Sequence, residues 1–264
     1  MNQDHVKEQL LAIEDAPLEF SLVFSGKKSK KVNGLYNPET REIVIHNRNF
    51  TDDNLLLYTA IHEYAHHLHA CTRGGKLSAR AHTSEFWAIL HNLLEKAEAK
   101  HIYRNVFASS PELTALTETI RTKYLAENGT LVKEFGEKLI VAHDLCEKIG
   151  GRFEDYIDRV LRIPRLAAMT AIKTHQYNIT PFVGPDNMRF LAGIRDEDTR
   201  AAAESALLGG KSPDSVKIAA KMQCAPSLEE PSRDRLEKEK ARLERTIGLL
   251  KKRLDDIEQE LEQC

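Results

Sequence analysis

A predicted helix that carries two histidines one turn apart constrains this chain more than any other feature of its sequence. Residues 61–69 read IHEYAHHLH and contain the motif H-E-x-x-H, from His62 to His66. At 3.6 residues per turn, positions 62 and 66 lie on one face of a helix, so both imidazoles can reach one metal ion. Glu63 is offset around the helix, close enough to hold a water molecule without being a ligand. The motif predicts a zinc site on a helix.

A short motif can also arise by chance in a chain with 11 histidines, and the segment would then be a purely structural helix. The flanking sequence favours the metal site. Residues 51–54, Thr-Asp-Asp-Asn, are typical of a helix N-terminus. Apolar residues around the motif predict that the helix is buried: Leu55, Leu56, Leu57, Ile61, Ala65 and Leu68. We therefore expect one Zn²⁺ per chain.

A third ligand must follow, because zinc in hydrolases takes three protein ligands and leaves a fourth position for water. The best source is the start of a second predicted helix, which Thr83 or Ser84 would cap. His82 lies at the mouth of this helix, and Glu85 lies in its first turn. We favour His82, with Glu85 as the alternative. The remaining candidates are histidines of the same region: His69, which the helical period rotates away from the pair, His91 and His101.

The sequence IHEYAHHLH followed by HTSEFWAIL resembles the SprT-like and related small bacterial zinc metallopeptidases. The segment NGLYNPETREIVIH, residues 33–46, resembles the hairpin that precedes their active-site helix, and the resemblance covers about residues 15–105. It implies that His82 is the third ligand and that Phe86 and Trp87 are the packing anchor of the second helix. It also implies a peptide or protein substrate.

The chemistry expected of such a site is hydrolysis of a peptide bond. Zinc polarises the scissile carbonyl and lowers the pKa of water toward about 7. Glu63 would take the proton of that water as general base and pass it to the leaving amine. A group that stabilises the oxyanion is also expected, and the sequence offers four candidates that it does not rank: Tyr58, Tyr64, His67 and His69.

The fold expected for residues 1–107 is an α+β, zincin-like domain with a short antiparallel sheet and the active-site helices. Three segments before the first helix are typical of short strands: Leu18–Phe24, Lys31–Tyr36 and Glu42–His46. This domain would be followed by an all-α region, a linker and a C-terminal coiled coil.

Residues 108–223 predict helices, because apolar residues recur every three or four positions between turn-forming pairs such as Asn128-Gly129 and Gly150-Gly151. Residues 145–164 have the pattern of a short helix, a turn and a second helix, and they resemble the helix-turn-helix of ParB-like partition proteins. Four arginines there are candidates for contacts to DNA phosphates: Arg152, Arg159, Arg162 and Arg165. The alternative is a solvated helical face, since Glu154, Asp155 and Asp158 lie among them.

The C-terminal segment, residues 232–264, predicts a coiled coil after a linker at 224–231. Apolar residues form a heptad seam, with charged residues around it, and this seam favours self-association. The seam consists of Leu236, Leu243, Ile247, Leu250, Leu254, Ile257 and Leu261, with Lys240 at one core position and Cys264 in the same register.

Composition excludes several other classes of protein. The net charge of −2 on 264 residues gives no global nucleic-acid footprint. No window approaches the roughly 18 apolar residues of a membrane span, and the N-terminus lacks the continuous apolar core of a signal peptide. The cysteines are far apart and form no C-x-x-C pair: Cys71, Cys146, Cys224 and Cys264. A cytoplasmic, reduced protein without a membrane partner is therefore expected.

Three functions remain open from the sequence. The first is a zinc-dependent endopeptidase whose helical region and coiled coil select its substrate or location. The second is a DNA-associated protease, which the resemblance and the predicted helix-turn-helix both favour. The third is a non-catalytic protein that uses zinc in a binding module or scaffold.

Overall fold

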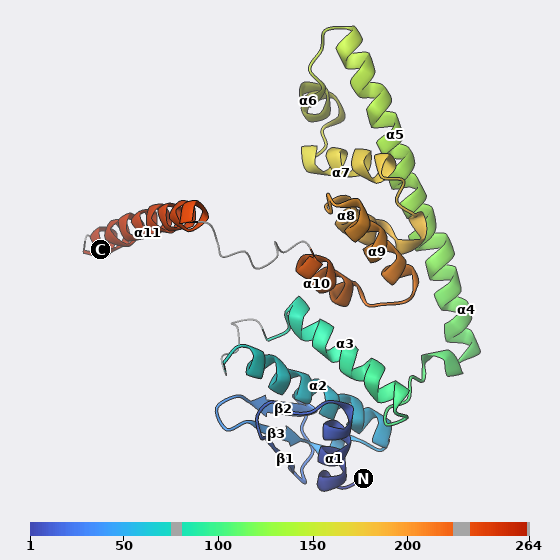
Figure 1. Cartoon of the computed structure of the whole chain (residues 1–264), viewed down its shortest axis with the longest axis vertical. Helices are drawn as coiled ribbons and strands as arrows, with labels where there is room; N and C mark the ends of the chain where they lie inside the picture. The colour runs from blue at the N-terminus through green and yellow to red at the C-terminus, as the bar shows by residue number, and fades with distance from the viewer. Residues whose placement is uncertain (75–80, 224–232, 263–264) are drawn as a thin grey trace. The chain divides into compact units, whose positions relative to one another are not determined.

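The computed structural model describes residues 1–74, 81–223 and 233–262, and it is mostly helical with one small sheet (Figure 1). An α and β mixture, expected from the sequence, is therefore confirmed. The chain divides into two compact units, Met1–Met222 and Gln223–Cys264. The larger unit begins with α1 (Gln3–Ile13), β1 (Ser21–Phe24), β2 (Gly34–Asn37), β3 (Glu42–Ile45), the short 3-10 helix η1 (Asn47–Asn49), α2 (Asp53–Thr72) and α3 (Ser84–Ala99).

The sheet is mixed, so the predicted antiparallel arrangement is wrong for one of its two pairs. The strand order is β1-β3-β2, with β1 parallel to β3 and β2 antiparallel to it. A tight turn joins β2 to β3, whereas the loop of residues 25–33 is long enough to carry the chain past the central position to the far edge. All three predicted strands are present and shorter than predicted, although β2 ends one residue later, at Asn37.

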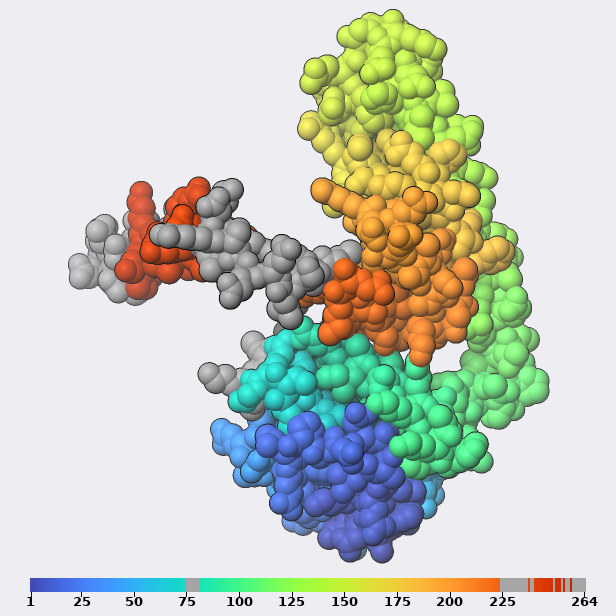
Figure 2. Space-filling model, viewed as in Figure 1, coloured from blue at the N-terminus to red at the C-terminus, as the bar shows by residue number. Residues whose placement is uncertain are grey.

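One apolar core joins α1, the sheet, α2 and α3, and Figure 2 shows the outer surface of these elements in blue to green. α2 lies at its centre, because it contacts α1, β2, β3 and α3. Its side chains are consequently buried around most of the helix, as expected for a helix that is apolar on several faces. Members of this core include Leu10, Ile43, Ile45, Ile61, Tyr64, Phe86 and Leu90.

The described part of residues 108–223 contains helices and no strand. The chain is helical without a break from Pro111 to Lys148, so the helix predicted to end near Asn128-Gly129 continues through it. Gly129 serves close packing there, since a Cβ on it would lie 2.7 Å from the carbonyl oxygen of Pro181. The elements are the short 3-10 helix η2 (Phe107–Ser109), α4 (Pro111–Thr119), the π-helix η3 (Ile120–Ala126), α5 (Glu127–Lys148), α6 (Phe153–Asp155), the π-helix η4 (Tyr156–Leu161), α7 (Arg165–Gln176), the short 3-10 helix η5 (Pro181–Val183), α8 (Pro185–Ala192), α9 (Glu197–Leu208) and α10 (Pro213–Gln223).

The predicted helix-turn-helix falls on the end of α5, on α6 and on η4. Its first helix is not short, because α5 has 22 residues and ends just before Gly150, which adopts a left-handed conformation. The second helix ends at Leu161 and is followed by Arg162, also left-handed at φ 55°, before α7 starts. The boundary predicted between residues 107 and 108 stays a prediction.

The smaller unit contains the helix α11 (Arg233–Glu262). Five apolar side chains of the predicted seam are exposed on it: Leu243, Ile247, Leu250, Leu254 and Ile257. The linker 224–231 and Cys264 lie outside the described residues. Pairing of this helix with a second copy stays a prediction. Within the described residues, every helix is too short or too polar to cross a membrane.

Replacing Gly136 with alanine should destabilise the protein by about 1–3 kcal/mol, because extra volume in a packed interface forces the helices apart. The added Cβ would lie 2.0 Å from the carbonyl oxygen of Ala171, where α5 meets α7. Denaturant unfolding measures the change. Gly151→Ala is the matched control, since its Cβ would find its nearest atom 3.6 Å away. Equal losses in both variants would contradict the close α5–α7 contact.

Candidate metal centre

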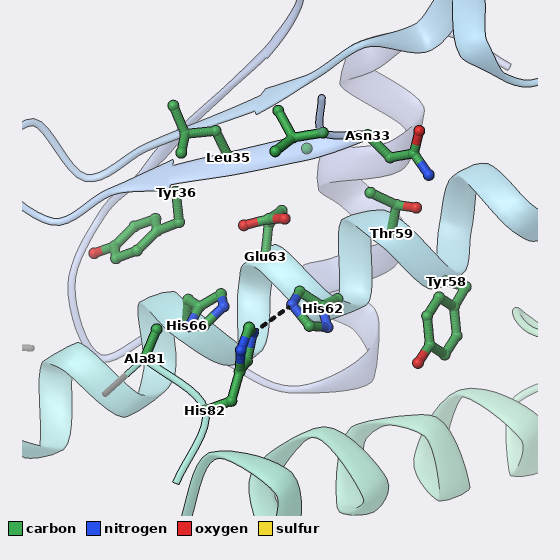
Figure 3. A pocket seen from close by; sticks show the side chains of 12 residues that line it. Asn33, Leu35, Tyr36, Tyr58, Thr59, His62, Glu63, His66, Ala81 and His82 are labelled. Atoms are coloured by element: carbon green, nitrogen blue, oxygen red, sulfur yellow. Dashed lines mark hydrogen bonds between the residues drawn. The ribbon is translucent and has the colours of Figure 1, made fainter. Parts of the chain in front are cut away.

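α2 supplies two of the candidate ligands, and a side-chain cap fixes where it starts. The Asp52 carboxylate accepts hydrogen bonds from the backbone N–H groups of Asn54 and Leu55, at 2.6 and 3.3 Å. This cap confirms the helix start predicted within residues 51–54. Counting on from this start, His62 and His66 lie on one face of the helix, as the H-E-x-x-H spacing requires (Figure 3).

The third imidazole comes from His82, directly before α3. The hydroxyl of Thr83 accepts a hydrogen bond from the backbone N–H of Phe86 at 3.3 Å, so Thr83 is the predicted cap of that helix. His82 thereby projects toward α2, beside the histidine pair (Figure 3). The structure brings together the three residues for which the sequence argued: His62, His66 and His82.

Geometry and donor type both fit a zinc ion. Nε2 of His62 and Nε2 of His82 are 3.1 Å apart, and the ligand atoms of all three histidines lie within 4.8 Å of one another. Tetrahedral zinc with Zn–N bonds of 2.0–2.1 Å needs nitrogens about 3.3 Å apart. Three imidazoles with a fourth position left open form a set that catalytic zinc sites use.

The imidazoles of His62 and His66 are held in their neutral form. Burial, with a smaller effect from neighbouring histidines, lowers the pKa of His66 to about 3 and that of His62 to about 4. Both rings are therefore uncharged at pH 7. A neutral imidazole offers a nitrogen lone pair, so protons do not compete with a metal ion for these two residues.

Aromatic side chains of α3 fix the orientation of the rings. Phe86 stacks on His66 with ring centroids 4.2 Å apart, and Trp87 stacks on His82 with centroids 5.5 Å apart. Phe86 is fully buried in the core. Phe86 and Trp87, which the resemblance implied as a packing anchor, thus position one ligand of α2 and the ligand that precedes α3.

Glu63 lies beside the ligands and against the sheet. Its side chain is almost completely buried, and burial raises its pKa to about 7. The backbone of Gly34 in β2 approaches it closely: a Cβ on Gly34 would lie 2.8 Å from Cγ of Glu63 and 3.0 Å from its Oε1. A glycine is required there for Glu63 to keep this position.

The three histidines and Glu63 line a cavity of about 410 Å³ (Figure 3). One wall is α2 and another is β2 with the residues before it. The lining residues are Val32, Asn33, Gly34, Leu35, Tyr36, Tyr58, Thr59, His62, Glu63, His66, Ala81 and His82. The sequence did not single out the β2 residues as parts of the site, although NGLYN was the segment that resembled the hairpin of the metallopeptidases.

A buried hydrogen-bond pair ties β2 to α2. The hydroxyl of Tyr36 and Nδ1 of His67 are 3.1 Å apart, and Nε2 of His67 is 3.0 Å from the carbonyl oxygen of Leu18. Burial raises the pKa of Tyr36 to about 12, which keeps its hydroxyl protonated. This contact sets the position of the strand that forms one wall of the cavity.

Of the four predicted oxyanion candidates, only Tyr58 lies among the described residues that line the cavity. Tyr64 is buried and donates its hydroxyl to the carbonyl oxygen of Glu14 at 2.8 Å. His67 faces Tyr36, and His69 is buried near Glu85. Tyr64, His67 and His69 are therefore buried in the core and do not line the cavity.

Glu85 is not brought to the three histidines. Its carboxylate pairs with Arg73, and the same Oε2 lies 3.6 Å from Nε2 of His69. The hydrogen bond from Arg73 lowers the pKa of Glu85. Two groups among the described residues have the spacing to hold a metal: His62, His66 and His82, and the more exposed His143, Asp144 and Glu147. The other candidate ligands, His69, His91 and His101, belong to neither group.

The arginines predicted to meet DNA are mostly paired with acids. Arg165 donates to both oxygens of Asp158, at 3.0 and 2.9 Å from Nε. Arg159 lies 3.5 Å from Asp155, Arg152 lies 3.8 Å from Glu154, and Arg162 follows η4. These pairs fit the alternative of a solvated face. DNA binding by the four arginines stays a prediction, which a salt-dependent mobility shift tests.

Comparison with models of protein families, with curated proteins and with solved structures finds no match to this chain.

Purified protein should contain one zinc per chain, and His82→Ala should lose it. Removing a direct ligand should weaken binding by more than the 10- to 100-fold that loss of an outer-shell partner typically costs. Metal analysis and competition with a chromogenic chelator measure both values. Glu85→Ala is the matched control and should keep its zinc. Loss of zinc from Glu85→Ala, with retention in His82→Ala, would show that Glu85 and not His82 is the third ligand.

Proposed function

We propose that this chain is a zinc-dependent endopeptidase of the SprT-like type. The observation that carries the proposal is the arrangement of three imidazoles and one buried carboxyl group around a single cavity. His62, His66 and His82 would hold the metal, and Glu63 would act beside it. A bound zinc ion supplies a Lewis acid that polarises a carbonyl group and acidifies water.

Glu63 has the properties of a general base. A proton acceptor works best when its pKa lies near the working pH, because it must take the proton and later release it. Burial raises the pKa of Glu63 to about 7, and the Gly34 backbone restricts the position of its carboxyl group. The carboxyl would accept a proton from water and deliver it to the leaving amine.

The exposed edge of β2 supports a peptide as the substrate. Among the described residues β2 pairs with β3 alone, and residues 33–36 line the cavity. The unpaired N–H and C=O groups of an edge strand can bind an extended peptide as an additional strand. A peptide bound in this way would run along the wall that faces Glu63. The histidines and their aromatic anchor also match the segments that resemble SprT-like metallopeptidases.

Replacing Glu63 with Gln should lower kcat/KM toward a cleavable peptide by about 100-fold or more, the usual contribution of a general acid–base group. Zinc content should not change, because Glu63 is not in the ligand group. Cleavage of a fluorogenic peptide library, with metal analysis of the same samples, measures both. Glu39→Gln, at the exposed turn after β2, is the matched control and should keep full activity.

Removing the metal with a chelator should abolish cleavage, and added zinc should restore it. Wild-type protein that carries zinc and cleaves no peptide would contradict the peptidase and leave a non-catalytic zinc module. Cleavage that survives both Glu63→Gln and the chelator would place the activity outside this site.

A further inference from the structure

Four lysines gather on one loop beside the cavity. Residues 25–33, here called the lysine loop, connect β1 to β2 and contain Lys27, Lys28, Lys30 and Lys31. All four side chains are exposed. None forms an ion pair with an acid in the part of the chain that the structure describes. The proposed peptidase makes no use of this charge.

Hydrogen bonds fix the backbone of the lysine loop. Ser29 donates its N–H to Oδ1 of Asn49 at 3.0 Å and accepts at its carbonyl oxygen from Nδ2 of Asn49 at 2.8 Å. Gly26 donates its N–H to Oδ1 of Asn47 at 3.0 Å. Both asparagines belong to η1. The loop is therefore held in shape while its lysine side chains are free to meet a ligand, which lowers the cost of binding.

The lysine loop leads directly into the wall of the cavity. Its last two residues, Val32 and Asn33, line the cavity, and β2 begins at the next position, Gly34. Figure 3 shows Asn33 at this junction. Nδ2 of Asn49 also donates to Oδ1 of Asn33 at 2.9 Å, so the same asparagine fixes the loop and its junction with β2. A chain bound along β2 and extending past Gly34 would run onto the lysines.

The lysines concentrate positive charge in a chain whose net charge is −2. From Lys27 to Lys31 the backbone spans at most about 15 Å, since consecutive Cα atoms are about 3.8 Å apart. The four lysines thus place their positive charges on one short stretch of backbone. An anionic ligand would relieve their mutual repulsion.

We propose that the lysine loop recognises a run of acidic residues in the protein substrate, on one side of the bond to be cleaved. The proposal rests on the peptidase function above, because it uses the same bound polypeptide. If that polypeptide pairs antiparallel with β2, its acidic run lies C-terminal to the scissile bond. An acidic peptide fits better than a nucleic acid, since the loop continues the strand edge that would bind the peptide.

Three peptides with one cleavable core test the proposal: one with four Glu after the core, one with four Glu before it and one with four Gln after it. Wild type should cleave the first with a kcat/KM about 10- to 100-fold above that of the Gln peptide, because four weak surface ion pairs add. The preference should fall at 500 mM KCl. Preference for Glu before the core would show parallel binding instead.

A variant in which Gln replaces all four loop lysines should cleave the Glu and Gln peptides with equal kcat/KM. The four lysines are Lys27, Lys28, Lys30 and Lys31. The matched control replaces four exposed lysines of the helical region with Gln and should keep the ratio: Lys123, Lys148, Lys217 and Lys221. Wild type that cleaves the Glu and Gln peptides equally, or a preference that survives in the loop variant, would overturn the proposal.

Binding provides a second test that does not need turnover. Fluorescence anisotropy of a labelled four-Glu peptide, with zinc-loaded Glu63→Gln, should show binding that is lost when the four loop lysines are also replaced. Lysine-dependent binding without cleavage by the wild type would refute the peptidase and keep the loop as a site for acidic peptides. Lysine-dependent binding of a DNA oligonucleotide, with none of the Glu peptide, would overturn the proposal in favour of nucleic acid.

Discussion

Burial of α2 between the sheet and α3 is the constraint on which the rest of the structure depends. The helix contacts α1, β2, β3 and α3, and it carries histidines and a glutamate into this dry environment. A buried polar group is costly unless it has a partner. His67 meets this requirement with Tyr36 and Leu18. Of the three candidate ligands only His66 is buried, and a metal ion bound by His62, His66 and His82 would supply its missing partner.

The same burial connects the metal site to the wall of the cavity. Tyr36 is part of β2, and its contact with His67 fixes the strand against α2. His67 is the residue directly after the candidate ligand His66. Gly34, at the start of that strand, approaches Glu63 so closely that no side chain fits between them. The position of Glu63, the proposed general base, and the position of β2 are therefore set together. The lysine loop leads directly into this strand.

Local features of the site could be predicted from the sequence, because they depend on residues a few positions apart. The spacing of His62 and His66, the cap at Asp52 and the cap at Thr83 are of this kind, and the structure has all three. The order of the strands could not be predicted, since alternation shows which face is buried and not which strand is the neighbour. Likewise, Glu85 remained a candidate ligand because its pairing with Arg73 depends on a distant side chain. Gly129 was misread as a turn because the sequence does not show the Pro181 backbone against it.

X-ray absorption at the zinc edge, on the full chain loaded with one equivalent of zinc, tests the central claim most directly. A site of three histidines predicts a first shell of nitrogen and oxygen at about 2.0–2.1 Å, with outer-shell scattering from three imidazoles. His82→Ala should reduce that scattering to two imidazoles. A first shell containing sulfur at about 2.3 Å, or one without imidazole scattering, would place the zinc elsewhere and contradict the account.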